Sequence, residues 1–127
     1  MEEQAVERTG ATAGSNQATP VAWQDLREWI ALVEANGLLK RIDQPVDADE
    51  ELAAIAYLAT RREDAPALMF DNIAGDRTGT SILTNMLGSS KERYALAVGL
   101  DPALSTAEMI AATRDLMQRR IKPVPVA

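Results

Sequence analysis

The pattern of apolar positions predicts an amphipathic helix shortly after Trp23. Four apolar residues recur at spacings of three and four, which places them on one face of a helix. These residues are Leu26, Trp29, Ile30 and Val33. Asp25 and Glu28 stand at the spacing of a capping box, and Gly37 supplies the left-handed conformation that commonly ends a helix. The first helix is therefore expected to start at a cap on Asp25 and to stop before Gly37.

Short apolar runs farther along the chain predict β-strands at residues 38–42, 67–70 and 81–86. Further helices are predicted where a cap pair precedes apolar positions at helical spacing. The pairs are Asp47 with Glu50, Ser89 with Glu92, and Ser105 with Glu108, and the second helix is expected to begin near Asp47 or Asp49. Arg61 and Arg62 are expected in its last turn, where cations complement the helix dipole, and Gly99 should end the third helix.

The resulting order is helix, strand, helix, strand, strand, helix, helix, which predicts a single α/β domain of mixed α+β type. We expect a small sheet of about three strands with roughly four helices. Strands 67–70 and 81–86 are placed to pair as a hairpin, although the loop between them is longer than the two-residue turns typical of hairpins. The residues predicted to be buried are Leu26, Trp29, Ile30, Val33, Leu52, Ile55, Leu68, Phe70, Ile82, Leu83, Leu96, Ile110 and Leu116, with Met69, Met86, Met109 and Met117 as core fillers.

The composition divides the chain into three parts. Residues 1–22 are small, polar and aperiodic, so burial cannot offset the entropy lost on ordering, and they are predicted to be a disordered extension. Residues 23–120 form the predicted domain, and residues 121–127 predict an extended linker or a truncated continuation. Trp23, at the first boundary, is expected either to pack as a hydrophobic staple or to meet a partner.

The absence of His and Cys removes several kinds of chemistry. It excludes Ser-His-Asp and Cys-His nucleophiles, the usual zinc sites and disulfides. Thirteen Lys and Arg against nineteen Asp and Glu give a net charge of −6, which argues against nucleic-acid binding. No apolar run approaches the ~18 residues that suggest a membrane span, and no signal peptide is evident, so a cytoplasmic location without membrane contact is expected.

The charged and glycine-rich clusters are each explained by helix ends or turns. The acidic group Asp47, Asp49, Glu50 and Glu51 lacks the glycine of a calcium loop and suits helix capping. The run from Gly75 to Gly79 lacks the Lys and the following helix of a P-loop, so a solvated turn is expected. Arg119, Arg120 and Lys122 follow the last helix, where the dipole accounts for them. The residues by themselves therefore predict no catalytic, cofactor-binding or metal-binding group.

Three segments, in order along the chain, resemble the opening of UbiD-family decarboxylases. The first runs from Asp25 to Ile42 and continues into Pro45-Val46-Asp47, the second from Pro66 to Gly75, and the third from Leu83 to Ser89 and from Lys91 to Gly99. The sequence departs from the family pattern at Glu63-Asp64-Ala65, where the family often has two glycines, and in the loop 76–80. The resemblance covers residues 23–125.

The resemblance implies an N-terminal structural domain or fragment of a UbiD-like carboxy-lyase. Members of the family decarboxylate aromatic or α,β-unsaturated acids reversibly with prenylated flavin mononucleotide (FMN), a divalent metal and potassium. The family's catalytic, flavin-binding and metal-binding residues all lie downstream of the matched part, so none is carried onto this chain. We therefore expect no cofactor on this chain and no activity from it alone.

Two alternatives remain open. One is a small subunit of a split decarboxylase, and the other is an independent interaction or regulatory module built on the same domain. In each case the implied partner is a catalytic UbiD-like domain or subunit, or a second copy through self-association. An apolar patch left exposed by the missing neighbour is the expected cause of such binding.

Overall fold

The computed structural model describes residues 21–123 and 125. In this part of the chain the elements are α1 (Leu26–Ala35), β1 (Leu39–Ile42), α2 (Glu51–Thr60), β2 (Ala67–Phe70), β3 (Ile82–Thr84), α3 (Lys91–Val98) and α4 (Thr106–Gln118). The predicted order and the predicted α/β fold class are confirmed. The disordered extension predicted for residues 1–22 lies almost wholly outside the described residues and stays a prediction. No helix in the described part has both the length and the apolar character needed to cross a bilayer.

The strands form one mixed sheet in the order β1-β2-β3. β1 and β2 are parallel and are joined through α2, as a crossover between parallel strands requires. β2 and β3 are antiparallel, with Met69 opposite Leu83, which confirms the predicted hairpin. β3 is shorter than the predicted strand 81–86 because Asn85 turns the backbone with a φ of 53°. The Asn85 amide then donates to the carbonyl of Pro66 at 3.0 Å.

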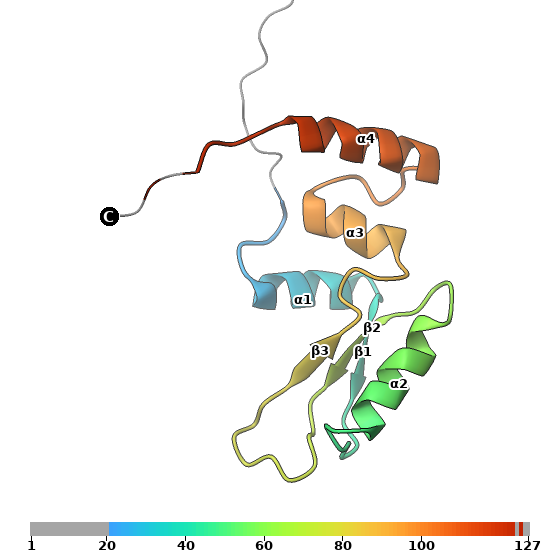
Figure 1. Ribbon diagram of the computed structural model, residues 1–127, viewed down its shortest axis with the longest axis vertical. Coiled ribbons are helices and arrows are strands. Elements are labelled where there is room, and N and C mark those ends of the chain that lie inside the picture. Colours follow the sequence, from blue (N-terminus) through green and yellow to red (C-terminus); the bar gives the residue numbers. More distant parts are fainter. Residues whose placement is uncertain (1–20, 124, 126–127) are drawn as a thin grey trace, which may run out of the picture.

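The sheet lies between two helices, with α1 on one face and α2 on the other (Figure 1). The cluster on the α2 face consists of Val46, Leu52, Leu68 and Phe70. The cluster on the α1 face consists of Trp29, Val33 and Ala67, with Leu96 and Ala97 of α3 packed against it. β2 contributes Ala67 to the cluster on the α1 face and Leu68 and Phe70 to the cluster on the α2 face, and all four of its residues are buried, so this central strand is buried on both faces. α3 and α4 follow as outer layers beyond α1 (Figure 1).

Most of the predicted core is confirmed. Five predicted residues are buried, namely Trp29, Val33, Leu52, Leu68 and Phe70. Six are half-buried, namely Ile30, Ile55, Ile82, Leu83, Leu96 and Leu116. The prediction is wrong for Leu26, which is 51% exposed in the first turn of α1, and for Ile110, which is exposed on α4. Among the methionines, Met69 and Met109 are buried, whereas Met86 and Met117 are exposed, since no described element covers them.

Two of the four predicted caps form as expected. Asp25 accepts a hydrogen bond from the Glu28 amide at 2.9 Å, and the Glu28 carboxylate accepts one from Gln24 rather than from Asp25. At α4, Ser105 and Glu108 form a complete, reciprocal capping box. These helix ends therefore depend on local side chains that the sequence spacing identifies.

The other two caps are wrong in detail. Asp47 does not cap α2, because its carboxylate accepts from the Asp49 amide at 2.7 Å and so forms a separate turn. α2 begins four residues later, after Glu50, whose side chain makes no cap bond. Ser90, not Ser89, caps α3, since Ser89 takes a left-handed φ of 56°. Arg61 and Arg62 lie just beyond the end of α2, outside the last turn that was predicted for them.

Candidate functional site

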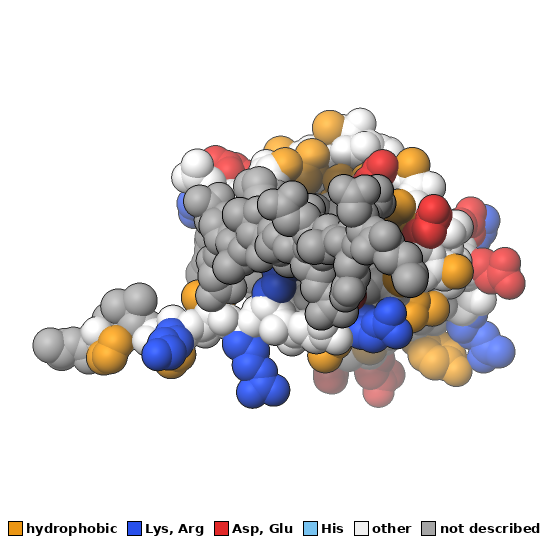
Figure 2. Space-filling view, turned by 90° about the horizontal axis from the view of Figure 1, so that it is seen from above, with side chains coloured by type: hydrophobic (Ala, Val, Ile, Leu, Met, Phe, Trp, Pro, Cys, Tyr) orange, Lys and Arg blue, Asp and Glu red, His pale blue; other side chains and the backbone are white. Residues whose placement is uncertain are grey.

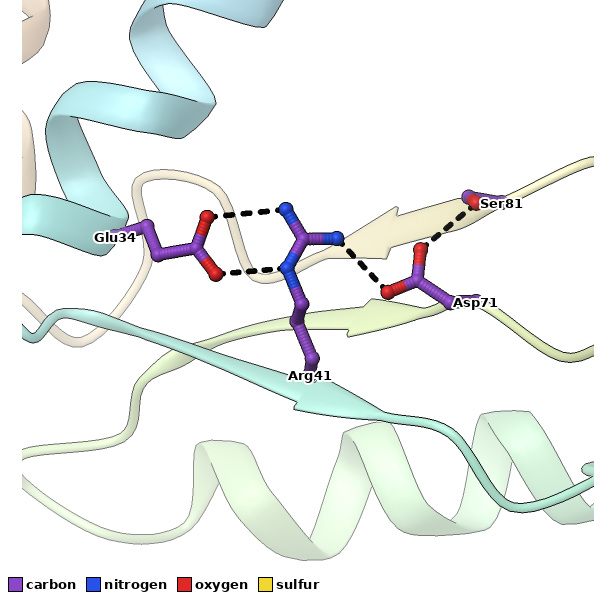
Figure 3. Close-up of polar contacts among 4 residues, drawn as sticks. All are labelled: Glu34, Arg41, Asp71 and Ser81. Carbon is purple, nitrogen blue, oxygen red and sulfur yellow. Dashed lines mark hydrogen bonds and ion pairs between the residues drawn. The ribbon is translucent and has the colours of Figure 1, made fainter.

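The most extensive group of charged contacts in the described structure centres on Arg41 of β1. Its Nε and Nη2 donate to the Glu34 carboxylate of α1 at 2.7 and 3.0 Å. Its Nη1 donates to Asp71 Oδ2 at 2.8 Å, just beyond the end of β2. Ser81, just before β3, donates to the other Asp71 oxygen at 2.9 Å (Figure 3). This Arg41 junction (Glu34, Arg41, Asp71 and Ser81) therefore connects α1 to all three strands.

The electrostatics of the Arg41 junction favour its fully ionised form. The hydrogen bonds from Arg41 hold the pKa of Glu34 below its usual range. The pKa of Asp71 is also lowered, mainly by its bond from Arg41 and further by the Ser81 hydroxyl. The pKa of Arg41 is raised, mainly by Glu34 and then by Asp71. Both carboxylates are ionised at neutral pH, so neither holds a proton for general-acid chemistry.

Two surface grooves adjoin Arg41. The larger, of about 740 Å³, runs between β1 and α2, where Ile55 and Ala59 form part of an apolar wall. Its charged side chains are mixed in sign, with Lys40 and Arg62 near Asp43 and Asp64. The smaller, of about 270 Å³, lies between α1 and the sheet, beside Glu34 and Asp71. The mixed charges give the larger groove no clear preference for an anionic or a cationic ligand.

The glycine-rich loop that was interpreted as a solvated turn is a closed Asp76 turn. Asp76 accepts hydrogen bonds from the amides of Thr78 at 3.1 Å and Thr80 at 2.8 Å, and from the Thr78 hydroxyl at 2.7 Å. These bonds lower the pKa of Asp76, the largest contribution coming from the Thr78 side chain. Because a carboxylate already occupies these amides, the loop cannot present them to a phosphate. The sequence prediction is therefore confirmed, with the Asp76 side chain as its physical reason.

The remaining predicted clusters stay separate from the Arg41 junction. Asp47 and Glu51 take part in turn contacts at the start of α2, where Glu51 accepts from the Asp47 amide at 3.0 Å. Arg119 and Lys122 follow α4 at the other end of the domain. Within residues 21–123 and 125, no three His, Cys, Asp or Glu side chains are grouped so that they could hold a metal ion.

Sequence reasoning missed the most deeply buried charged residue, Arg93 of α3. Its guanidinium donates to the backbone carbonyls of Ala65 at 2.7 Å, Met86 at 2.9 Å and Gly88. Burial lowers the pKa of Arg93. Sequence alone could not identify this role, because the acceptors of the Arg93 guanidinium are backbone carbonyls. Every residue has such a carbonyl, so the sequence does not mark these three. The Arg41 junction was missed for a related reason, since Glu34, Asp71 and Ser81 come from three other segments.

The described fold is similar to known carboxy-lyases. The family model of the 3-octaprenyl-4-hydroxybenzoate carboxy-lyase N-terminal domain, UbiD_N, matches residues 30–113. The vanillic acid decarboxylase of Sedimentibacter hydroxybenzoicus in its open form is 31% identical with a TM-score of 0.65, over 73% of this chain and 19% of that chain. The closed form gives 31% identity and a TM-score of 0.64, over 72% of this chain and 19% of that chain.

A third structure is the open form of the same enzyme, ShVdcCD, with a truncated ShVdcD component. It is 30% identical with a TM-score of 0.66, over 74% of this chain and 20% of that chain. The chain therefore spans about a fifth of the length of the decarboxylase chains it matches. The family match begins within α1, takes in the whole sheet and the Arg41 junction, and ends within α4. On this evidence the chain belongs to the UbiD family of carboxy-lyases, and its matched part is that family's N-terminal domain.

Proposed function

We propose that this chain is the N-terminal structural domain of a UbiD-like carboxy-lyase and that it does not catalyse decarboxylation alone. The observation that carries the proposal is the match of residues 30–113 to the family's N-terminal domain, together with coverage of only a fifth of the matched decarboxylase chains. The substrate class is that implied by the family resemblance, aromatic or α,β-unsaturated acids. The rest of the enzyme supplies the reactive site.

The residues present do not fit the family's cofactor. When bound, prenylated FMN supplies an electron sink, and its phosphate requires amides, cations or a metal. In the described part of the chain, the amides of the Asp76 turn are occupied, the Arg41 guanidinium is held by two carboxylates, and no group of acidic residues is arranged to hold a metal. These groups therefore give the flavin phosphate no partner on this part of the chain.

The Arg41 junction has a structural part in this proposal. It ties α1 to the ends of the strands, so the sheet and the helix keep one relative position. A rigid domain presents its outer surface to a partner with a smaller loss of conformational entropy on binding. The proposed partner is the catalytic part of the carboxy-lyase, and the proposed location is the cytoplasm.

A small subunit of a split decarboxylase is the second candidate. One of the similar structures of ShVdcCD contains a truncated ShVdcD, so a second component is named in that enzyme. The coding sequence that follows Ala127 distinguishes the two versions. A continuous reading frame with the family pattern supports one chain, and a separate frame supports a split enzyme.

The test is to purify the 127-residue chain and supply prenylated FMN, Mn²⁺ and K⁺. Flavin retention is measured by absorbance after gel filtration, and CO₂ release is measured from cinnamic-type and hydroxybenzoic acids. We expect neither from the chain alone and expect CO₂ release once the remainder of the carboxy-lyase is added. Tight flavin binding or turnover by the isolated chain would overturn the proposal.

A further inference from the structure

Helix α4 carries large apolar side chains that the rest of the described structure leaves uncovered. Ile110 is 66% exposed and Met117 is 78% exposed, one helical repeat of seven residues apart. Arg114 stands between them at helical spacing, so these three residues form one line along the helix. Ile121, just past the end of α4, is 65% exposed. We call Ile110, Arg114 and Met117 the α4 stripe.

The α4 stripe lies next to the line of residues through which α4 contacts α3. Met109 is buried there, Leu116 is half-buried, and Thr113 accepts a hydrogen bond from the Tyr94 hydroxyl at 3.0 Å. Each stripe residue follows one of these by a single position, a rotation of about 100° around the helix. The apolar surface of α4 therefore continues past the part that α3 covers, and a core-facing helix normally buries an arc of this width.

α4 is also held weakly by its own domain. Neither core cluster contains an α4 residue, and Met109 is the one buried residue of α4. Helices of this length are marginal in water without tertiary packing. The capping box of Ser105 and Glu108 stabilises its start, but a cap contributes only about 1 kcal/mol. A helix of this kind gains most from a neighbour that covers its remaining apolar arc.

The charge on the α4 stripe indicates the chemistry of that neighbour. Arg114 has no hydrogen bond or ion pair with the residues that the structure describes, and the acidic residues Glu108 and Asp115 lie on the opposite side of the helix by its rotation. Seen from the α4 side, Lys and Arg side chains lie along the segment that extends from the body, whereas the visible Asp and Glu side chains lie around the body, among other Lys and Arg (Figure 2). A complementary surface is apolar and carries a carboxylate.

We propose that the α4 stripe is the surface through which this domain docks on the catalytic part of a UbiD-like carboxy-lyase, against an apolar patch with a carboxylate placed for Arg114. This inference rests on the proposed function. The occupant follows from the matched decarboxylase chains, in which the same fold makes up about a fifth of the chain and is accompanied by the remaining four-fifths. Burying Ile110 and Met117 there provides the apolar contact, and the Arg114 ion pair sets the register.

The test replaces the matched fifth of the S. hydroxybenzoicus vanillic acid decarboxylase with this full chain and measures vanillic acid decarboxylation and the melting temperature of the chimera. The variants are Ile110→Asp combined with Met117→Asp, Arg114→Glu, and Arg114→Lys. Ala111→Asp is the matched control, because Ala111 is exposed on α4 but outside the stripe. The same variants of the free chain are compared by circular dichroism, and we expect their spectra and melting temperatures to match the parent.

The double Asp variant and Arg114→Glu should each lower chimera activity by about tenfold or more, with a lower melting temperature. Arg114→Lys should recover most of the activity, and Ala111→Asp should behave like the parent. If the parent chimera is active and the stripe variants match it, the docking inference is overturned while the proposed function stands. If the parent chimera does not assemble, both fail. Self-association of the free chain that the double Asp variant abolishes would assign the stripe to a second copy and overturn this occupant.

Discussion

The Arg93 guanidinium on α3 donates to the carbonyl of Ala65, 28 positions earlier in the chain, at 2.7 Å. The same side chain is 1% exposed and reaches the carbonyls of Met86 and Gly88 in the segment between β3 and α3. One side chain thus satisfies the backbone on both sides of the β2–β3 hairpin. Buried carbonyls need such donors, since an unpaired buried polar group costs free energy comparable to a lost hydrogen bond.

Replacing Arg93 by Met should therefore destabilise the domain severely. The variant has an apolar side chain of similar length but leaves the buried carbonyl of Ala65 and the partly buried carbonyls of Met86 and Gly88 without their donor, and we expect a loss of about 3 kcal/mol in the free energy of unfolding. Urea denaturation of the full chain measures it. Arg77→Met is the control, because Arg77 is exposed in the Asp76 turn, and it should change stability by less than about 0.5 kcal/mol. Equal stability of the two variants would contradict the role of Arg93.

The Arg41 junction should make stability depend on pH in the acid range. Folding lowers the pKa of Glu34 and of Asp71, so the folded state binds fewer protons than the unfolded state while these groups titrate. Their contribution is complete above the unfolded pKa values and is lost as the pH falls below about 4. Arg41→Gln should flatten this dependence.

The measurement is the urea midpoint of the parent and of Arg41→Gln between neutral pH and about pH 3. Part of the slope should persist in the variant, because Asp76 and Glu108 also have lowered pKa values from bonds outside the junction. Parallel curves for the two proteins would show that the ion pairs do not stabilise the fold.

Trp29 tests the packing of the α1 face. Its ring is 2% exposed in the cluster with Val33 and Ala67, so Trp29→Ala should cost about 3–5 kcal/mol through the cavity it leaves. Trp29→Phe should cost much less, because the buried indole Nε1 has no hydrogen-bond partner in the described structure. Thermal and urea unfolding measure both. A loss below about 1 kcal/mol for the Ala variant would show that this face is not packed as described.

Asp76 should control the order of its turn. Asp76→Ala removes the acceptor of the Thr78 and Thr80 amides, so we expect faster hydrogen exchange at both positions. Exchange in β2 should stay unchanged, since the strand hydrogen bonds do not depend on Asp76. Arg77→Ala is the neighbouring control. Unchanged protection of Thr78 and Thr80 in Asp76→Ala would mean that the glycine conformations alone hold the turn.

Sequence periodicity predicted the elements well wherever a local pattern repeats. The spacing of Trp29 and Val33 placed α1, and the caps at Asp25 and Ser105 were correct because both partners lie within one helical turn. The cap at Ser89 was wrong by one residue because two adjacent serines fit the motif equally well. The cap predicted at Asp47 was wrong because Asp side chains also form turns. Its carboxylate accepts a hydrogen bond from the Asp49 amide instead of from an amide in the first turn of α2.

Burial was less predictable, because a stripe of apolar residues does not reveal what covers it. Ile110 and Met117 fit a helix face as well as Met109 does, yet of these three only Met109 is buried. The same limitation explains Leu26 in the first turn of α1. Which half of an apolar arc is buried depends on the position of a second element, and helical spacing contains no such information.

The sequence by itself determined the order of helices and strands, the family resemblance and the absence of the chemistry that His and Cys would have supplied. These follow from residue types and from spacings within one or two turns. Only the tertiary structure decided the parallel pairing of β1 with β2, the Arg41 junction and the burial of Arg93. Each of these joins groups that are distant in the chain, and their free energy depends on distances and solvent exclusion that arise only once the sheet and helices have packed together.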